Sequence, residues 1–403
     1  MLRYCGKGST IFHNDRLLNV TDPNILWKSV PRKRIFNKVP NRIPNVPPLR
    51  FPEFTGEWEK KQLQEECSFF SGGTPSSSNK EYYDGDIPFI RSGEIDAQHT
   101  ELFLTQKGYN NSSAKMVEIG DLLLALYGAT SGEIAINKIH GAINQAILCI
   151  RSPYNNVFVK SIWKKHVLHI LQTYLQGGQG NLSADIVKKL SFYFPSNREQ
   201  DKISEFVALV DQRIETQNKI IQHLESLIKG ISKMLLTKRG NTFIKDCLVC
   251  NSSTLQESSV LPCGKYPVYG ATGISGYLDV PQVEHDAILI IKDGAGVGNV
   301  RYATDKHGVI GTLNYLSAKN GYNLKYLYYC LRIFNFTPFV TGLAIPHIYF
   351  RDYGNAKIYC PSLIEQKHIA NNLSNIERKI EVEKQILEKF KEQKKYLLSQ
   401  MFI

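Results

Sequence analysis

The stretch Pro195-Ser196-Asn197-Arg198-Glu199-Gln200 opens a long amphipathic segment, and Pro361-Ser362-Leu363-Ile364-Glu365-Gln366 repeats that opening 166 positions later. After each opening the apolar residues recur on a seven-residue period, which predicts one apolar stripe along a helix rather than a strand. We call this stripe the seam. The first seam comprises Ile203, Val207, Val210, Ile214, Gln217, Ile221, Leu224, Ile228, Ile231 and Leu235.

The second copy keeps the same register over its whole length. Its seam comprises Ile369, Leu373, Ile376, Ile380, Glu383, Leu387, Phe390, Lys394, Leu397 and Met401. The polar residue Gln217 of the first seam recurs as Glu383. A polar seam residue costs stability but selects register and partner, so its recurrence predicts that the two helices pair with each other. The alternative is two unrelated amphipathic helices on separate cores.

The bulk properties allow several domains and a nucleic-acid partner. The chain has 403 residues, enough for two or three domains with their own cores. Its net charge of +12 and its 21 tyrosines are compatible with binding to phosphate backbones. A ribosomal or membrane-surface protein could show the same balance. No apolar run reaches the roughly 18 residues that span a bilayer, and the N-terminus lacks a signal-peptide pattern, so we expect a cytoplasmic protein with no membrane partner.

The eight cysteines are scattered along the chain. The single Cys-x-x-Cys, from Cys247 to Cys250, has only Cys263 nearby and no second pair. Because a structural zinc site needs four ligands, we expect reduced thiols and no metal site.

The rest of the chain divides around the two long helices. Residues 1–50 are basic and proline-rich, which predicts a flexible N-terminal segment. From residue 51, short apolar runs alternate with turn residues, as in an α+β domain with a mostly antiparallel sheet. The expected strands are 87–90, 121–126, 133–136 and 142–150, the expected helices are 157–175 and 183–190, and a loop is expected at 177–180.

The same pattern restarts after the first long helix. Ala287–Ile291 repeats Asp121–Ala125 at the 166-residue offset, and Gly294 and Gly298 repeat Gly128 and Gly132. We therefore predict an internal duplication of a domain followed by a long helix. The predicted segments are the flexible N-terminus 1–50, the first domain 51–193, the central helix 194–239, the second domain 240–360 and the C-terminal helix 361–403.

The run Asp293-Gly294-Ala295-Gly296-Val297-Gly298 resembles a dinucleotide-binding loop. It is followed by the strand-like residues 299–302 rather than by a helix, so we interpret it as a turn between two strands. We find no phosphate loop, no adenine-methyltransferase motif of the Asn-Pro-Pro-Tyr kind and no acidic pair of a restriction nuclease. The sequence therefore predicts no catalytic residues.

The remaining polar loop residues are suited to reading DNA. Arg, Lys, Asn and Gln can bond base edges, while Ser, Thr, Tyr and Lys suit phosphate. Each single residue could equally be an ordinary solvated or capping side chain. The candidates in the first domain are Lys80, Tyr82, Tyr83, Arg91, Ser92, Gln98, His99, Thr130, Ser131, Asn144 and Gln145. Those in the second domain are Lys265, Tyr269, Lys292, Asn299, Arg301, Lys306, His307, Asn314, His347 and Arg351.

Several of these segments together resemble the DNA-specificity subunits of type I restriction-modification systems. The resemblance covers about residues 51–403. The matching segments are Leu49-Arg50-Phe51-Pro52-Glu53-Phe54 before Trp58, Ile87-Pro88-Phe89-Ile90-Arg91, Gly120-Asp121-Leu122-Leu123 and both Pro-Ser-x-x-Glu-Gln openings. The long N-terminal segment departs from the family pattern.

The resemblance implies two target-recognition domains, separated by two helices that form an antiparallel coiled coil in a pseudo-two-fold arrangement. Each domain of that family reads one half of a bipartite double-stranded DNA site, and the helices bind two methyltransferase subunits. The subunit itself holds no cofactor. The partner methyltransferase carries S-adenosylmethionine, and a restriction and translocation subunit uses ATP and Mg²⁺. Two other interpretations stay open: an adaptor that bridges proteins without reading DNA, and a solitary enzyme.

Overall fold

The computed structural model describes residues 37–38, 45–175 and 181–403. They form two compact units. The first unit contains the described residues up to Glu215 together with Leu387–Ile403, and the second contains Thr216–Ile386. Most of the expected flexible segment 1–50 and the whole of the expected loop at 177–180 lie outside the described residues.

The end of the expected flexible segment is structured. Strand β1 (Asn37–Lys38) pairs antiparallel with β2 (Leu49–Arg50). Arg50 is only 6% exposed, and its Nε and Nη2 atoms each donate to the Glu199 carboxylate at 2.7 Å. A buried charge is tolerated only when it is paired and hydrogen-bonded, so this ion pair ties the segment to the first long helix.

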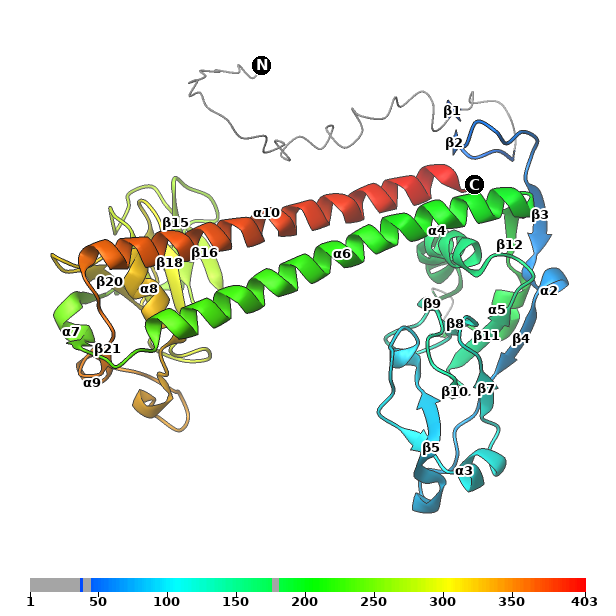
Figure 1. The fold of residues 1–403 in the computed structure, drawn as a ribbon, viewed down its shortest axis with the longest axis horizontal. Coiled ribbons are helices and arrows are strands. Elements are labelled where there is room, and N and C mark those ends of the chain that lie inside the picture. Colours follow the sequence, from blue (N-terminus) through cyan, green and yellow to red (C-terminus); the bar gives the residue numbers. More distant parts are fainter. Residues whose placement is uncertain (1–36, 39–44, 176–180) are drawn as a thin grey trace. The chain divides into compact units, whose positions relative to one another are not determined.

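Small sheets and helices build the first unit outside its long helices (Figure 1). One sheet has the order β6-β5-β10-β7, another has the order β4-β11-β8-β9, and β12 pairs with β3. The strands are β3 (Glu59–Gln62), β4 (Ser68–Ser71), β5 (Tyr83–Ile90), β6 (Phe103–Leu104), β7 (Lys115–Val117), β8 (Leu122–Ala125), β9 (Ile134–Ile136), β10 (Gly141–Ile143), β11 (Ile147–Arg151) and β12 (Ser191–Phe194). The helices are α2 (Leu63–Glu66), α3 (Gln106–Asn110), α4 (Asn156–Leu175) and α5 (Ala184–Lys189), with 3-10 turns η2 (Lys80–Tyr82) and η3 (Ser92–Glu94).

The α+β class is correct, and the pairing is mostly antiparallel, but two details of the prediction are wrong. The strands form several small sheets rather than one. The single strand expected at 142–150 is two strands, β10 and β11, which belong to different sheets. Asn144 breaks the run, because its side-chain oxygen accepts a hydrogen bond from the Ala146 N–H at 3.1 Å and thus closes a turn.

Strand β8 lies at the centre of the first unit's core. Leu122 and Leu124 belong to the large cluster that includes Trp163 of α4, whereas Leu123 and Ala125 belong to a second cluster on the other face. Alternate side chains of a strand point to opposite faces, so β8 is buried on both sides. This position explains why its sequence is an unbroken apolar run.

The second unit repeats this architecture with shorter helices (Figure 1). Its sheets have the orders β14-β20-β17-β18, β16-β15-β19 and β13-β21. The strands are β13 (Thr242–Phe243), β14 (Leu248–Ser252), β15 (Tyr266–Gly270), β16 (Gly273–Leu278), β17 (Ala287–Ile291), β18 (Val300–Ala303), β19 (Gly308–Val309), β20 (Leu313–Ala318) and β21 (Lys357–Ile358). The helices are α7 (Ile244–Cys247), α8 (Leu324–Ile333) and α9 (Phe350–Tyr353), with 3-10 turns η4 (Glu257–Ser259) and η5 (Thr337–Phe339).

The duplicated glycines occupy equivalent turns. Gly128 and Gly294 have φ values of +86° and +87°, a backbone region that favours glycine. The pair Gly132 and Gly298, both near φ +85°, follows in each turn. Antiparallel pairs β8–β9 and β17–β18 flank the two turns. The turn interpretation of 293–298 is therefore confirmed.

The two long helices are α6 (Asn197–Leu236) and α10 (Leu363–Met401). In the first unit, Asp211 forms an ion pair with Lys394, and the Arg213 guanidinium lies 4.7 Å from the Phe390 ring centroid. The residue number of the contact on α10 falls as that on α6 rises, so the segments of the two helices within this unit run antiparallel.

The same helices also contact each other within the second unit. Gln217 Nε2 donates to the Glu383 main-chain oxygen at 3.1 Å and to its carboxylate, and both residues are 7% exposed. Lys384 forms an ion pair of 2.7 Å with Glu225. The two polar seam residues therefore meet. A coiled coil along the whole length and a pseudo-two-fold arrangement stay predictions.

Candidate nucleic-acid interface

Parallel pairing brings four predicted DNA contacts to one edge of the first unit. Strands β5 and β10 run parallel, with Ile90 opposite Ile143. Their carboxyl ends therefore meet, and the next residues along the two chains come together there. We call this edge the first strand end, comprising Arg91, Ser92, Asn144 and Gln145. The Asn144 N–H donates to the Ile90 main-chain oxygen at 3.4 Å, and the exposed Gln145 accepts from the Thr74 hydroxyl.

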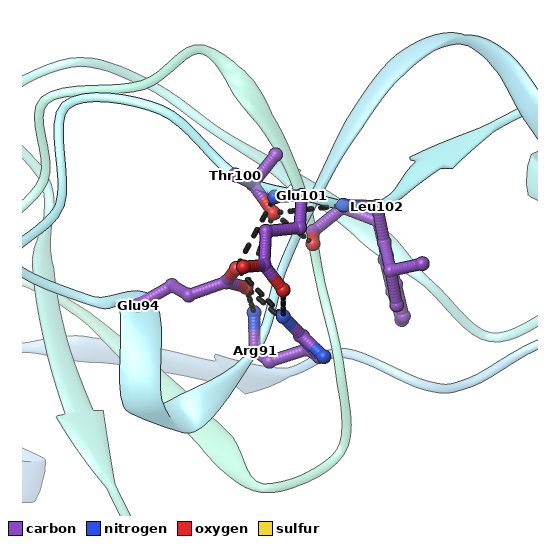
Figure 2. Close-up of polar contacts among 6 residues, drawn as sticks. Arg91, Glu94, Thr100, Glu101 and Leu102 are labelled. Atoms are coloured by element: carbon purple, nitrogen blue, oxygen red, sulfur yellow. Dashed lines mark hydrogen bonds and ion pairs between the residues drawn. The ribbon is translucent and has the colours of Figure 1, made fainter. Parts of the chain in front are cut away.

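Arg91 is held at this strand end by two carboxylates (Figure 2). Its Nη2 atom donates to Glu94 Oε1 and to Glu101 Oε2, both at 2.9 Å, and its Nε atom donates to Glu94 Oε2 at 3.1 Å. The side chain is 41% exposed, compared with 15% for Glu94 and 82% for Glu101. The three residues border a shallow hollow of about 410 Å³.

Glu94 is the anchor of this group. Besides the guanidinium, its carboxylate accepts the main-chain N–H groups of Arg91 and Glu101 at 3.0 and 3.2 Å and the Thr100 hydroxyl at 3.1 Å. Burial disfavours its charge, but the hydrogen bonds from Arg91 outweigh burial and lower the pKa of Glu94 to about 2. The carboxylate is therefore ionised throughout the neutral range.

The other candidates of the first unit lie elsewhere. Lys80, Tyr82 and Tyr83 lie at the other end of β5 from Arg91, beyond the irregularity at which both Tyr83 and Ile87 pair with Leu104. Gln98 and His99 are exposed in the loop after η3. Thr130 and Ser131 lie in the β8–β9 turn, where the Ser131 hydroxyl donates to the Leu126 main-chain oxygen at 2.9 Å. These residues do not join the first strand end.

A second strand end occupies the equivalent place in the second unit. Strands β15 and β19 run parallel with Tyr269 opposite Val309. Gly270 and Ala271 therefore lie at the carboxyl end of this parallel pair, as Ile90 and Arg91 do in the first unit. Arg301 of β18 reaches this edge. Its Nη1 and Nη2 atoms donate to the main-chain oxygens of Gly270 and Ala271 at 3.4 and 3.0 Å.

Two candidates of the second unit are buried, so the prediction of exposed contacts is wrong for them. His307 is 0% exposed, its Nδ1 lies 2.9 Å from the Asp305 main-chain oxygen, and burial lowers its pKa. Asn314 is 4% exposed and accepts a hydrogen bond from the Ser252 hydroxyl at 2.8 Å. Both side chains are therefore buried in the interior and do not lie on a surface that a ligand could contact.

The remaining candidates are scattered over the second unit. Lys292 lies beside the segment that carries His347, because the Ile348 N–H donates to the Lys292 main-chain oxygen at 2.9 Å. Lys306 pairs with Glu284 at 3.2 Å. The others are Lys265 beside the Tyr266 ring, Tyr269 in edge contact with the His307 ring, the exposed Asn299, and Arg351 over the Tyr349 ring.

The sequence reasoning missed Glu94 and Glu101 because it searched for donors to DNA and not for the groups that position them. One local signal was present: the run Arg91-Ser92-Gly93-Glu94 has the spacing of a capping box, in which the fourth side chain returns to the first main-chain N–H. Glu101 had no such signal, since its contact with Arg91 depends on the loop that follows.

The described residues contain no group of three or more His, Cys, Asp or Glu side chains placed to hold a metal ion. None of the described helices combines the length and apolar character needed to cross a membrane.

Comparison with known proteins bears directly on this architecture. The model of the type I restriction modification DNA specificity domain matches residues 55–226 and again residues 243–392. The chain belongs to this family. The two matches agree with the internal duplication, and they place both long helices partly inside the repeated domain.

Two relatives illustrate the range of similarity. The MjaIX specificity subunit of a type I restriction enzyme from Methanocaldococcus jannaschii is 27% identical over 189 residues, 44% of this chain and 43% of the relative. The chain thus spans less than half the length of that relative. The EcoprrI specificity subunit from Escherichia coli is 22% identical over 344 residues, 74% of this chain and 82% of the relative.

The fold also matches a solved structure. A type I restriction-modification S subunit from M. genitalium superposes with a TM-score of 0.59 at 17% identity, covering 89% of this chain and 99% of the other. At this identity the match establishes the fold and not the residues of the site.

Proposed function

We propose that this chain is the DNA-binding specificity subunit of a type I restriction-modification complex, and that each recognition domain reads one half of a bipartite double-stranded DNA site. One observation carries the proposal: each unit has its own core and its own parallel strand end with an arginine, Arg91 in the first and Arg301 in the second. Family membership and the net charge of +12 support it.

The long helices are proposed to dock two methyltransferase subunits. Within the second unit, α6 carries apolar side chains seven residues apart outside the seam: Ile220, Leu227 and Met234 are 40%, 42% and 67% exposed. A row of exposed apolar side chains along one helix is a common feature of protein interfaces. In this proposal the chain is not catalytic and holds no cofactor. The methyltransferase supplies S-adenosylmethionine, and a restriction subunit supplies ATP and Mg²⁺ chemistry.

The decisive experiment maps methylated bases across the genome of a host that expresses this chain with its partner methyltransferase. We expect one bipartite motif with a fixed unspecified gap. A host expressing the methyltransferase alone is the control, and it should lack the motif. If the motif is absent although the two proteins co-purify, the chain is an adaptor rather than a reader.

Exchange of residues 240–360 for the same region of a relative separates the two readers. We expect one half of the methylated motif to change and the other half to persist. A change in both halves would contradict independent readers. Methyl transfer by the isolated chain would instead favour a solitary enzyme.

Spacer length gives a further test of the helices. Inserting four residues between Ile214 and Ile221 adds about 6 Å of helix. Because base pairs are spaced by about 3.4 Å, we expect the unspecified gap to grow by one or two base pairs while the half-sites persist. An unchanged gap with full activity would show that the helices do not set the spacing.

A further inference from the structure

The Arg91 guanidinium still has free donors after its two carboxylates are satisfied. The Glu94 carboxylate accepts hydrogen bonds from Nε and from one N–H of Nη2, and the Glu101 carboxylate accepts one from the other N–H of Nη2. Nη1 has no hydrogen-bond partner among the described residues, and Figure 2 shows it pointing away from both carboxylates. On Glu101, Oε1 likewise has no bonded partner among those residues. The group therefore keeps one free donor atom, Nη1, and one free acceptor atom, Oε1.

We propose that Arg91 and Glu101 together read one G·C base pair in the major groove, and that Glu94 is the residue that positions Arg91. This inference rests on the proposed DNA-reading function. Arg91 would donate to the guanine acceptors O6 and N7, and Glu101 would accept from the amino group of the paired cytosine. Arginine to guanine and glutamate to cytosine are both established forms of base recognition.

The contact between the two side chains keeps their free atoms near each other. Arg91 Nη2 is bonded to Glu101 Oε2 at 2.9 Å, so Nη1 and Oε1 belong to two adjacent groups. In a G·C pair, guanine O6 and cytosine N4 are likewise neighbours, joined by an N–H···O hydrogen bond of about 2.9 Å. Nη1 can therefore donate to guanine while Oε1 accepts from the paired cytosine, and the contact between Nη2 and Oε2 stays intact.

The local charge favours a base over a phosphate. Arg91 carries one positive charge, whereas Glu94 and Glu101 carry two negative charges within 2.9 Å of it. The net charge of the group is therefore negative, and it repels a phosphate. A base edge is neutral, so the same group can bind it through paired donors and acceptors.

Glu94 supplies the rigidity that such recognition needs. A free arginine loses rotamer entropy when it is ordered, whereas Arg91 is already held through its Nε and Nη2 atoms. The Glu94 carboxylate is in turn fixed by two main-chain N–H groups and the Thr100 hydroxyl. The guanidinium is thus oriented before DNA arrives, which is the condition for discriminating one base pair from another.

The test measures base preference with the full chain in complex with its methyltransferase. Duplexes carrying the methylated motif are changed one base pair at a time in each half-site, and their dissociation constants are compared for the wild type, Glu101→Ala, Arg91→Lys and Glu94→Gln. Glu118→Ala is the matched control, since that carboxylate is 62% exposed and pairs with His140 in the same unit.

We expect the wild type to prefer G·C at one position of one half-site by about 5- to 150-fold. Glu101→Ala and Arg91→Lys should each reduce that preference to a few-fold, at that position alone, and Glu94→Gln should do the same by loosening Arg91. The control variant should keep the wild-type profile. Because Glu101 is 82% exposed, its variant should fold normally even if Arg91→Lys or Glu94→Gln does not.

Three results would overturn the inference. Variants that leave every position unchanged would show that the group is structural. Uniform weakening at all positions, with a salt dependence smaller by about one phosphate contact, would assign Arg91 to the backbone. A wild type with no sequence preference at all would remove the proposed function itself, and this inference with it.

Discussion

The two long helices open with the same motif but in different surroundings. Glu199 at the start of α6 is 1% exposed and receives the Arg50 guanidinium, whereas Glu365 at the equivalent place on α10 is exposed. The neighbouring glutamines behave alike: Gln200 and Gln366 each donate to the main-chain oxygen of the proline that opens the motif, at 3.0 and 2.9 Å. A residue that bonds locally therefore keeps its role in both copies, while one that needs a distant partner does not.

The strand ends differ in the same way. Arg91 is a strand-end residue paired with carboxylates, while Arg301 comes from β18, a strand of a different sheet, and is held by main-chain oxygens. Among the described residues no carboxylate lies within ion-pair distance of Arg301. The two units thus place a guanidinium at one edge by different routes and with different net charge. Under the proposed function, we therefore expect them to contact DNA differently.

The largest expected difference between the copies is in stability. Glu199→Ala leaves Arg50 buried without its partner, so the free energy of unfolding of the first unit should fall by about 3–5 kcal/mol. Glu365→Ala, at an exposed site, should change the second unit by less than about 0.5 kcal/mol. Urea unfolding followed by tryptophan fluorescence reports the first unit, because Trp58 and Trp163 lie in its core. The second unit is followed by circular dichroism. Equal effects would show that the motif acts alike in both copies.

The next difference concerns DNA. Arg301→Ala should weaken binding to all sequences alike and should lower the slope of log K against log salt by about 0.9, as expected for one lost phosphate contact. Arg91→Ala should instead cost about 1–3 kcal/mol at one base pair and leave that slope nearly unchanged. Salt titrations on the cognate duplex and on a scrambled duplex measure both quantities. Identical salt slopes for the two variants would remove the distinction between the strand ends.

The polar pair within the second unit should have a smaller effect. Gln217→Leu removes a donor from Glu383, which keeps its ion pair with Lys379, so the cost should be about 1 kcal/mol. Changing Gln217 and Glu383 together to leucine should recover most of that loss, because no buried acceptor is left unpaired. Circular dichroism in urea measures both variants. A double variant that is less stable than the single one would contradict this pairing.

The last effect is absent at neutral pH and appears only in acid. The folded pKa of Glu94, about 2, lies below its ordinary value of 4.5, so its stabilising contribution is present above pH 4.5 and is lost as the pH falls toward 2. Glu94→Gln should therefore make the melting temperature of the first unit less sensitive to pH across this window. The Trp58 and Trp163 fluorescence follows the melt, and Glu118→Gln serves as the control. An unaltered pH dependence in Glu94→Gln would show that another carboxylate carries it.

Local patterns explain which parts of the fold could be predicted. The apolar run of β8, the helix α4 and the glycine turn at 293–298 depend on neighbours in the sequence, and all three were predicted close to their observed places. The break at Asn144 was missed, because a single side-chain hydrogen bond ended an otherwise continuous apolar run.

The sequence by itself determined the duplication, the two long helices with their register, and the α+β class, because each depends on periodicity or on residues a few positions apart. Only the tertiary structure decided that Arg50 forms an ion pair with Glu199, that β5 and β10 run parallel, and that Glu94 and Glu101 hold Arg91. Those contacts join segments by loops and packing that no periodicity encodes. A hydrogen bond depends on distances of a few tenths of an ångström, which are set only when the whole unit has folded.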